Sequence, residues 1–126
     1  MSFASANVGK IIYNKVNSTV AVYPQYPPQA TAAPYCVYVI LRSDPSDTKD
    51  GAAWSDFITV LIHVYDTSYA NCAAKSISIR GLLDHLSGTI ESVVLKSCIF
   101  VTESDDFDDD LQLNIKTMEF RFWISN

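Results

Sequence analysis

The hydrophobic positions near the N-terminus recur with the period of a helix. Val8, Ile11 and Ile12 fall on one side of such a helix. Lys10 and Asn14 fall on the other side, which would face solvent. The spacing therefore predicts a first helix over the opening residues of the chain, with one aliphatic stripe available for burial.

A second helix is predicted over residues 67–88. Thr67 or Ser68 can cap its start, because a side-chain oxygen at that position accepts a hydrogen bond from a free backbone N–H. Gly88 stands where the residue after a helix often adopts a positive φ. The hydrophobic positions in between predict the buried stripe: Cys72, Ile79, Leu83 and Leu86, with Leu82 beside it.

Five segments show the composition or the alternation of β-strands. Residues 35–41 are an unbroken run of β-branched and aromatic residues, which is typical of a strand covered on both faces. Residues 54–66 alternate, and one side of this strand is expected to form the core: Ile58, Val60, Ile62 and Val64. The remaining strands are predicted at 20–22, 92–103 and 111–124.

The last two predicted strands differ in their patterns. Residues 92–103 alternate between two sets of side chains: Val94, Lys96, Cys98 and Phe100 against Val93, Leu95, Ile99 and Val101. In residues 111–124 the hydrophobic side changes midway, from Leu111, Leu113 and Ile115 to Met118, Phe120, Phe122 and Ile124. Such a change predicts a bulge, or a strand that extends past the edge of its own domain.

The predicted order is a helix, three strands, a helix and two strands. Two helices cannot cover both faces of a five-stranded sheet. We therefore expect an α+β fold, with a mostly antiparallel sheet of about five strands and the two helices packed on one face. The other face would be partly wet or would meet a partner. The length of 126 residues fits a single domain spanning residues 1–126.

Composition and charge exclude several classes of partner. The formal net charge is −5 and the nine Lys and Arg residues are scattered, so we expect no sequence-specific binding of nucleic acid. We find no signal peptide and no run of ~20 apolar residues, and hence expect no membrane association. Cys36, Cys72 and Cys98 have no paired spacing, which favours free thiols in the core over one disulfide and one free thiol.

An acidic run resembles a metal site at first sight: Glu103, Asp105, Asp106, Asp108, Asp109 and Asp110. It falls between the last two predicted strands, and we expect it to form a hairpin loop. A calcium loop of the helix–loop–helix kind needs a glycine at its sixth position and a glutamate at its twelfth. Counted from Asp106, these positions hold Leu111 and Thr117. We therefore expect no bound metal, and a solvated tip whose like charges repel one another.

Neither histidine stands in a catalytic pattern. His63 falls on the more polar side of its strand. His85 neighbours Asp84 and Ser87, but adjacent helical positions face different ways. The sequence contains no nucleophile-elbow motif and no glycine-rich phosphate loop. We therefore expect no enzymatic activity and no cofactor.

Tyrosines around a proline-rich segment are candidates for a contact surface. Tyr23, Tyr26 and Tyr35 are large and amphipathic, and side chains of this kind are enriched at protein interfaces. Residues 24–27, PQYP, match the PxxP pattern of peptide ligands. Because such short motifs are common in ordinary proline loops, a stiff loop is the simpler interpretation.

The C-terminal segment is rich in aromatic residues. Phe120, Phe122 and Trp123 lie where a chain end tends to fray unless it is tied down. Their large apolar area must pack on something. Two interpretations are open: the core of the same chain, or a neighbouring subunit.

Several segments, taken in order, form a familiar pattern. They are VYP at 22–24, PYCVYVIL at 34–41, TKDG at 48–51, HVYD at 63–66, the helical segment 68–91, ESDDFDDDLQ at 103–112 and KTMEFRFWI at 116–124. Over roughly residues 8–124 the chain resembles the tail-completion, or tail-terminator, proteins of long-tailed phages and prophages. That family is structural, which agrees with the lack of a catalytic motif.

The resemblance implies a small α+β domain that assembles as a hexameric ring. The ring would cap the tail tube, stop its growth and join the tube to the head connector. The implied partners are other copies of the chain, the tail-tube protein and the head-connector protein, first in the host cytoplasm and then in the virion. The family's proline–aromatic segment matches Tyr23, Pro24, Pro34 and Tyr35, its hairpin loop matches residues 48–51, and its acidic segment matches residues 106–110.

Under this interpretation the acidic run acquires a function. Six copies of a chain with charge −5 would form a ring of about −30, which would repel DNA phosphates and let a duplex slide through. The carboxylates expected to face the lumen or a partner are Asp105, Asp106, Asp108, Asp109 and Asp110. Two alternatives remain: a monomeric cytosolic protein-binding module that uses the acidic hairpin as its contact, and, as the least favoured, a small hydrolase.

Overall fold

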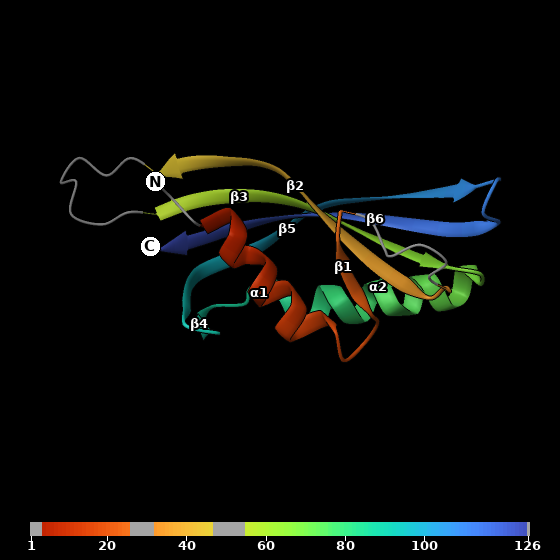
Figure 1. Cartoon of the computed structure of the whole chain (residues 1–126), viewed down its shortest axis with the longest axis horizontal. Coiled ribbons are helices and arrows are strands. Elements are labelled where there is room, and N and C mark those ends of the chain that lie inside the picture. The colour runs from red at the N-terminus through yellow and green to blue at the C-terminus, as the bar shows by residue number, and fades with distance from the viewer. Residues whose placement is uncertain (1–3, 26–31, 47–54, 126) are drawn as a thin grey trace.

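The computed structural model describes residues 4–25, 32–46 and 55–125, which form two helices and one six-stranded sheet (Figure 1). In chain order the elements are α1 (Ala4–Val16), β1 (Val22–Pro24), β2 (Tyr35–Ser46), β3 (Ser55–Asp66), α2 (Tyr69–Leu83), β4 (Gly88–Ile90), β5 (Val93–Asp108) and β6 (Leu113–Ser125). Across the sheet the order is β1-β2-β3-β6-β5-β4. β1 pairs with β2 in parallel, and the other neighbours pair antiparallel.

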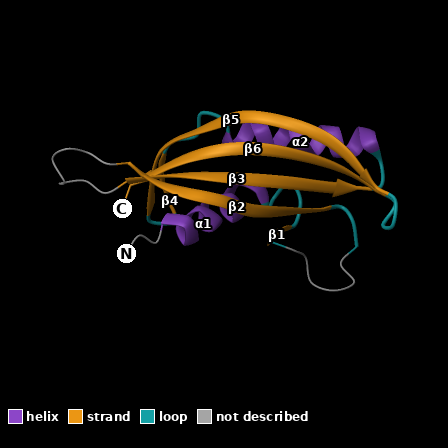
Figure 2. Cartoon of the chain, turned by 90° about the horizontal axis from the view of Figure 1, so that it is seen from above, coloured by secondary structure: helices purple, strands orange, loops and turns teal. Residues whose placement is uncertain are grey.

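Both helices lie on the same face of the sheet. Figure 1 shows α1 and α2 beneath the strands, and the view in Figure 2 shows the strands in front of both helices. The fold is therefore mixed α+β with a mostly antiparallel sheet, as predicted, and it contains the additional short strand β4. We call the side of the sheet that the helices do not cover the open face.

The end of α2 and the start of β4 differ from the prediction. The helix ends at Leu83, Asp84 is its C-cap, and His85 takes a φ of 64°. His85 N then donates a hydrogen bond to Cys98 O at 2.7 Å, which draws the chain onto β5. Gly88, expected after the helix end, instead begins β4 with a φ of 121°. A strand of three residues is too short to show a period in the sequence.

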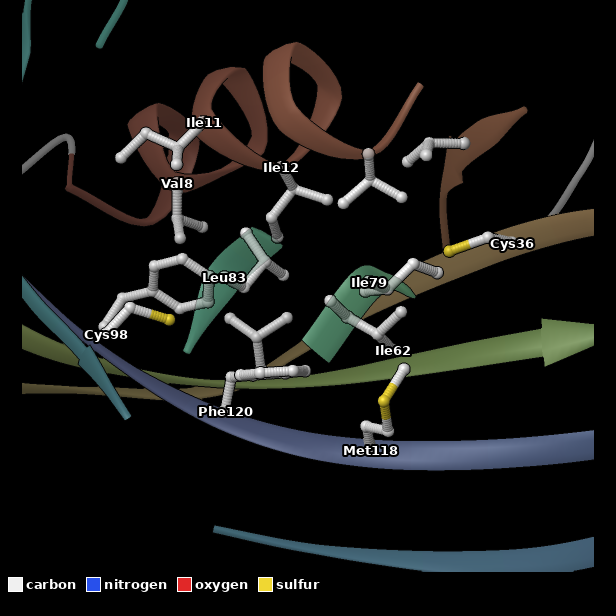
Figure 3. Close-up of a cluster of buried hydrophobic side chains, with 14 of the residues drawn as sticks. Val8, Ile11, Ile12, Cys36, Ile62, Ile79, Leu83, Cys98, Met118 and Phe120 are labelled. Carbon is white, nitrogen blue, oxygen red and sulfur yellow. The ribbon is translucent and has the colours of Figure 1, made fainter. Parts of the chain in front are cut away.

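The core lies between the helices and the covered face of the sheet (Figure 3). The core contains these side chains, none of which has exposed surface: Val8, Ile11 and Ile12 of α1, Ile79 and Leu83 of α2, Ile58, Val60, Ile62 and Val64 of β3, and Met118, Phe120, Phe122 and Ile124 of β6. The alternation predicted for β3 is thus confirmed. Phe120 and Phe122 fill the core of their own chain, which leaves neither ring any surface for a neighbouring subunit to contact.

The three cysteines are free and buried, as expected from their spacing. Cys36 and Cys98 have no exposed surface, and Cys72 has 1%. Burial raises the pKa of Cys36 to about 12, because a thiolate is poorly solvated inside the core. The thiols therefore stay protonated at neutral pH and pack as small apolar side chains.

Asp66 fixes the turn from β3 into α2. Its carboxylate accepts hydrogen bonds from Lys75 Nζ at 2.9 Å and from Ser68 N at 3.3 Å. Burial alone would raise the pKa of Asp66, but the hydrogen bonds from Lys75, Ser68 and Thr67 outweigh burial and hold it below its usual range. Ser68 is the N-cap of α2, and its Oγ accepts a hydrogen bond from the backbone N–H of Asn71. This confirms one of the two predicted caps.

The predicted bulge in the last strand is absent. β6 pairs with β3 in continuous register from Asn114 to Ser125. The hydrophobic side changes because a second, smaller cluster lies on the open face at the start of β6, where Leu113 packs with Tyr35 and Val37. The change of side in the sequence therefore marks two cores on opposite faces of one regular strand.

The bulges lie in the neighbouring strand instead. β5 shifts its register with β6 between Leu95 and Ser97 and again between Phe100 and Thr102. The strict alternation predicted for residues 92–103 is therefore wrong, since each bulge reverses the phase. The side chains of β5 that pack against the core are Val93, Leu95, Cys98 and Phe100.

Two isoleucines on α2 test this assignment of the core. Ile79 has no exposed surface, whereas Ile77 is 71% exposed. We expect Ile79→Ala to lower the free energy of unfolding by about 2–5 kcal/mol, through lost burial and a cavity. Ile77→Ala should change it by less than about 0.5 kcal/mol. Urea unfolding of both variants at equal protein concentration measures the difference, and equal losses would contradict the placement of α2 on the sheet.

Candidate interaction surface

The open face carries an aromatic cluster near each end. At the end where β2 begins, Tyr35 stacks on Tyr65 with the ring centroids 4.8 Å apart. Tyr35 is only 5% exposed and packs with Val37 and Leu113. Burial raises the pKa of Tyr35, and the charge of Asp108 raises it further. Tyr35, which the sequence suggested for a contact surface, therefore stabilises the sheet and presents little surface to a partner.

The rest of the proline–aromatic segment borders this cluster. Tyr23 packs against it and is half-buried, whereas Pro24 and Pro34 are exposed. Tyr26 lies outside the described residues, as do residues 48–51 of the predicted hairpin loop. In the described part of this segment, the surface open to a neighbour therefore comes from the two prolines and part of Tyr23.

The second cluster borders a groove near the C-terminal end of β6, which we call the aromatic groove. Phe57 of β3 and Trp123 of β6 are direct cross-strand partners, and their rings stack with centroids 5.2 Å apart. The groove has a volume of about 270 Å³. Its lining consists of Phe57, Ser97, Ile99, Val101, Arg121 and Trp123.

Two cations lie over the rings of the aromatic groove. The Arg121 guanidinium carbon is 4.3 Å from the centroid of Phe57, and Lys96 Nζ is 4.7 Å from the centroid of Trp123. Among the described residues, neither cation is paired with a carboxylate. The indole N–H of Trp123 is buried and has no hydrogen-bond acceptor within the described part of the chain. The groove therefore combines apolar walls with positive charge and an unused donor.

Sequence reasoning found only one residue of this groove. Trp123 was expected to pack either in the core of its own chain or on a neighbouring subunit. It is half-buried and lies on the side of β6 opposite to the core. The other members come from three strands that are separate in the chain. Alternation places Phe57 and Arg121 away from the core, but only the register of β3, β6 and β5 brings them together with Ile99.

The acidic run lies at the other end of the sheet, and most of it is not a loop. We call residues 103–112 the acidic hairpin. β5 continues to Asp108, so that Glu103, Asp105 and Asp106 are strand residues and the turn begins only at Asp109. The sequence predicted a loop because the run falls between two predicted strands, and Asp is depleted in strands. Pairing with β6 over the full length overrides that preference.

Asp105 differs from the other carboxylates of the acidic hairpin. It lies 3.1 Å from Lys116 Nζ on the neighbouring strand, and it accepts a hydrogen bond from Tyr69 Oη at 3.0 Å. The hydrogen bonds from Lys116 and then Tyr69 hold the pKa of Asp105 below its usual range. Asp105 therefore holds the hairpin to the start of α2, and its charge is compensated within the chain.

The turn of the acidic hairpin is built by Asp108. Its Oδ1 accepts hydrogen bonds from the backbone N–H of Asp110 at 2.9 Å and of Leu111 at 3.0 Å. Gln112 completes the turn with a φ of 55°. Asp109 and Asp110 are exposed, and two large apolar side chains lie beside them: Phe107 is 45% exposed and Leu111 is 57% exposed. The tip is therefore both acidic and apolar.

The described residues bring few reactive groups together. His63 Nδ1 lies 2.8 Å from Thr117 Oγ1, its cross-strand partner, and burial lowers the pKa of His63. His85 Nε2 lies 3.7 Å from Asp84 but is exposed at the end of α2. Within the described ranges, no third residue orients the His63 imidazole for nucleophilic catalysis. In the same ranges, His, Cys, Asp and Glu side chains form no group of three that could hold a metal ion.

Comparison with known proteins finds chains of similar fold among solved structures. A scan against protein-family models finds no match to this sequence, and a search of curated proteins finds none. Among solved structures, a chain of the structure described as "Virion of native gene transfer agent (GTA) particle" has the same fold, with a TM-score of 0.73 and 17% sequence identity. The match covers 99% of this chain and 100% of that chain. At this identity the likeness establishes a shared fold.

Among the described residues, no helix combines the length and the apolar composition that crossing a membrane requires.

The contact between Asp105 and Lys116 can be tested by titration. We expect the side-chain carboxyl carbon of Asp105, followed by NMR, to titrate below the usual aspartate range, because the folded chain favours its charged form. Lys116→Met should move the midpoint upward. The stability that Asp105 contributes is present above the usual aspartate pKa and is lost as the pH falls through the lowered value.

Lys10→Met serves as the matched control for this titration. Lys10 is exposed on α1, so the variant loses the same charge far from the hairpin and should leave the midpoint of Asp105 unchanged. An equal upward shift in both variants would show that net charge, not the Lys116 contact, sets the pKa.

Proposed function

We propose that this chain is a structural virion protein, a single-domain tail-terminator subunit whose ring caps the tail tube and joins it to the head connector. The observation that carries the proposal is the shared fold over nearly the whole of both chains with a chain of a gene transfer agent virion. The order of segments that resembles tail-completion proteins supports the finer assignment. The first line of support is the fold, and the second is the order of segments in the sequence.

The distribution of surface chemistry supports assembly as the role. The described residues offer an apolar, cationic groove at one end of the open face and an acidic, apolar tip at the other. Exposed apolar side chains rimmed by charge are typical of protein-binding surfaces. A subunit that must contact two neighbours and two different partners needs several surfaces of this kind.

The charge of the chain suits a ring through which DNA passes. Six subunits of −5 each would give a formal charge of about −30, and such a wall repels phosphates. Within the acidic hairpin, the described contacts compensate Asp105 through Lys116, which leaves Asp106, Asp108, Asp109 and Asp110 as the carboxylates available to a lumen or a partner. The partners in this proposal are the tail-tube and head-connector proteins, met in the host cytoplasm and kept in the virion.

The alternative is a monomeric module that binds a protein through its acidic hairpin. The exposure of the hairpin tip favours it, because the tip presents Phe107 and Leu111 together with charge. Oligomeric state separates the two functions, since a monomeric module needs no contact between copies.

The test combines mass measurement with imaging. We expect native mass spectrometry of the purified chain to show a hexamer and negative-stain microscopy to show rings. Added to purified tail tubes, gold-labelled protein should bind at tube ends only. A strict monomer that leaves tube ends unlabelled would contradict the proposal. A neighbouring portal gene and tail-tube gene on the same genome would support it.

A further inference from the structure

We propose that the acidic hairpin of one copy inserts into the aromatic groove of the next copy, so that subunits join head to tail. This inference deepens the proposed ring and rests on it. The occupant of the groove is thus a defined segment of a second copy, residues 106–111. The argument rests on the placement of the two surfaces, on their charge and on their apolar side chains.

The two surfaces lie at opposite ends of the same strands. The turn between β5 and β6 is at one end of the molecule in Figure 1, and the C-terminal end of β6 is at the other. Leu113 and Trp123 are ten residues apart in a continuous strand, which spans about 33 Å at the usual rise. The hairpin cannot bend back over that distance, because β5 and β6 are paired along its whole length. Only another molecule's hairpin can reach the groove.

The charges of the two surfaces are opposite. Asp106, Asp108, Asp109 and Asp110 make the tip acidic, and in the described chain no cation pairs with them. Arg121 and Lys96 make the groove basic, and their described contacts are with aromatic rings. Nearby, Arg42 and Asp44 neutralise each other at 2.9 Å, and Glu119 lies on the open face of β6 two residues before Arg121. Carboxylates arriving from a second copy would meet two unpaired cations.

The apolar side chains also match. Phe107 and Leu111 are the exposed large apolar residues of the tip. The groove presents the rings of Phe57 and Trp123 and the half-exposed side chains of Ile99 and Val101. A volume of 270 Å³ holds roughly nine waters, and one large side chain would displace several of them. The tip therefore supplies both the apolar anchor and the acceptors that a docked segment needs.

The proposed contact joins two different surfaces, so it is heterologous. Each subunit would use its groove for one neighbour and its hairpin for the other. Heterologous contacts of this kind generate a closed ring when the rotation between subunits closes, and a filament when it does not. An isologous dimer would use the same surface on both copies and would stop at two.

Charge reversal on each surface tests the contact. Arg121→Glu changes the groove, and Asp109→Lys with Asp110→Lys changes the tip, where neither side chain makes a hydrogen bond that builds the turn. Each variant alone should weaken assembly by at least about tenfold in dissociation constant. Native mass spectrometry and light scattering measure it. Lys10→Glu, an exposed reversal on α1, should assemble like the unaltered chain, and circular dichroism checks that every variant is folded.

Mixing the two variants gives the decisive result. In the mixture, the aspartate tip of the groove variant meets the intact groove of the tip variant, and the lysine tip meets the glutamate groove, so the two variants should co-assemble in alternation. A chain carrying all three substitutions should assemble again, because both charges are exchanged. Raised salt should weaken the unaltered contact.

The remaining outcomes overturn the inference in distinguishable ways. If the unaltered chain forms rings and both variants form them equally well, the contact lies elsewhere and the ring proposal stands. If each variant alone fails to assemble and their mixture does not co-assemble either, the two surfaces do not meet each other. A chain that remains monomeric and leaves tube ends unlabelled overturns both the contact and the ring.

Discussion

The structure depends on the burial of one face of β3 and β6 beneath two helices. These are the central strands, and their side chains toward the helices have no exposed surface along most of their length. A fully buried aliphatic or aromatic side chain contributes roughly 1.5–3 kcal/mol, so this one layer supplies most of the driving force for folding. Two helices are enough for one face only. The other face of the same strands has to be stabilised without a third layer.

Direct cross-strand pairs stabilise the open face instead. Tyr35 stacks on Tyr65, Phe57 stacks on Trp123, and His63 contacts Thr117, and in each case the two residues are partners in the register. Arg121 lies over the ring of Phe57 and Lys96 lies over the ring of Trp123, and both cations shield these rings from water. These pairs and cations leave part of the aromatic surface exposed. At the aromatic groove, apolar rings lie beside Arg121 and Lys96, which pair with no carboxylate among the described residues, and the buried indole N–H has no acceptor there.

The sequence predicted the covered face well and the open face poorly. The alternation of Ile58 and Val60 identified the core side of β3, because a buried face tolerates few polar residues. β4 and the bulges of β5 could not be predicted, since a three-residue strand has no period and a bulge leaves no local sequence signal. The aromatic groove depends on the register between three strands. Trp123 suggested a contact, but Phe57 reaches the groove only because β3 pairs with β6, and Arg121 meets Ile99 only because β6 pairs with β5.

In the sequence, the acidic run resembles a metal site and the aromatic C-terminus needs a packing partner, and the two features look unrelated. The structure relates them, because both lie on one hairpin, about ten residues apart along β6 and at opposite ends of the molecule. Within the described chain, Lys116 neutralises only the carboxylates at the base of the hairpin, Glu103 and Asp105. Within the hairpin, the carboxylates that no described cation pairs with therefore lie toward the tip, and Arg121 and Lys96 lie at the groove. A rigid subunit with unlike charges at its two ends has an intrinsic direction. In the proposed contact between copies, end-to-end association brings unlike charges together, whereas parallel side-by-side stacking would bring like charges together. The proposed ring requires such a direction, and the length of a single hairpin would supply it.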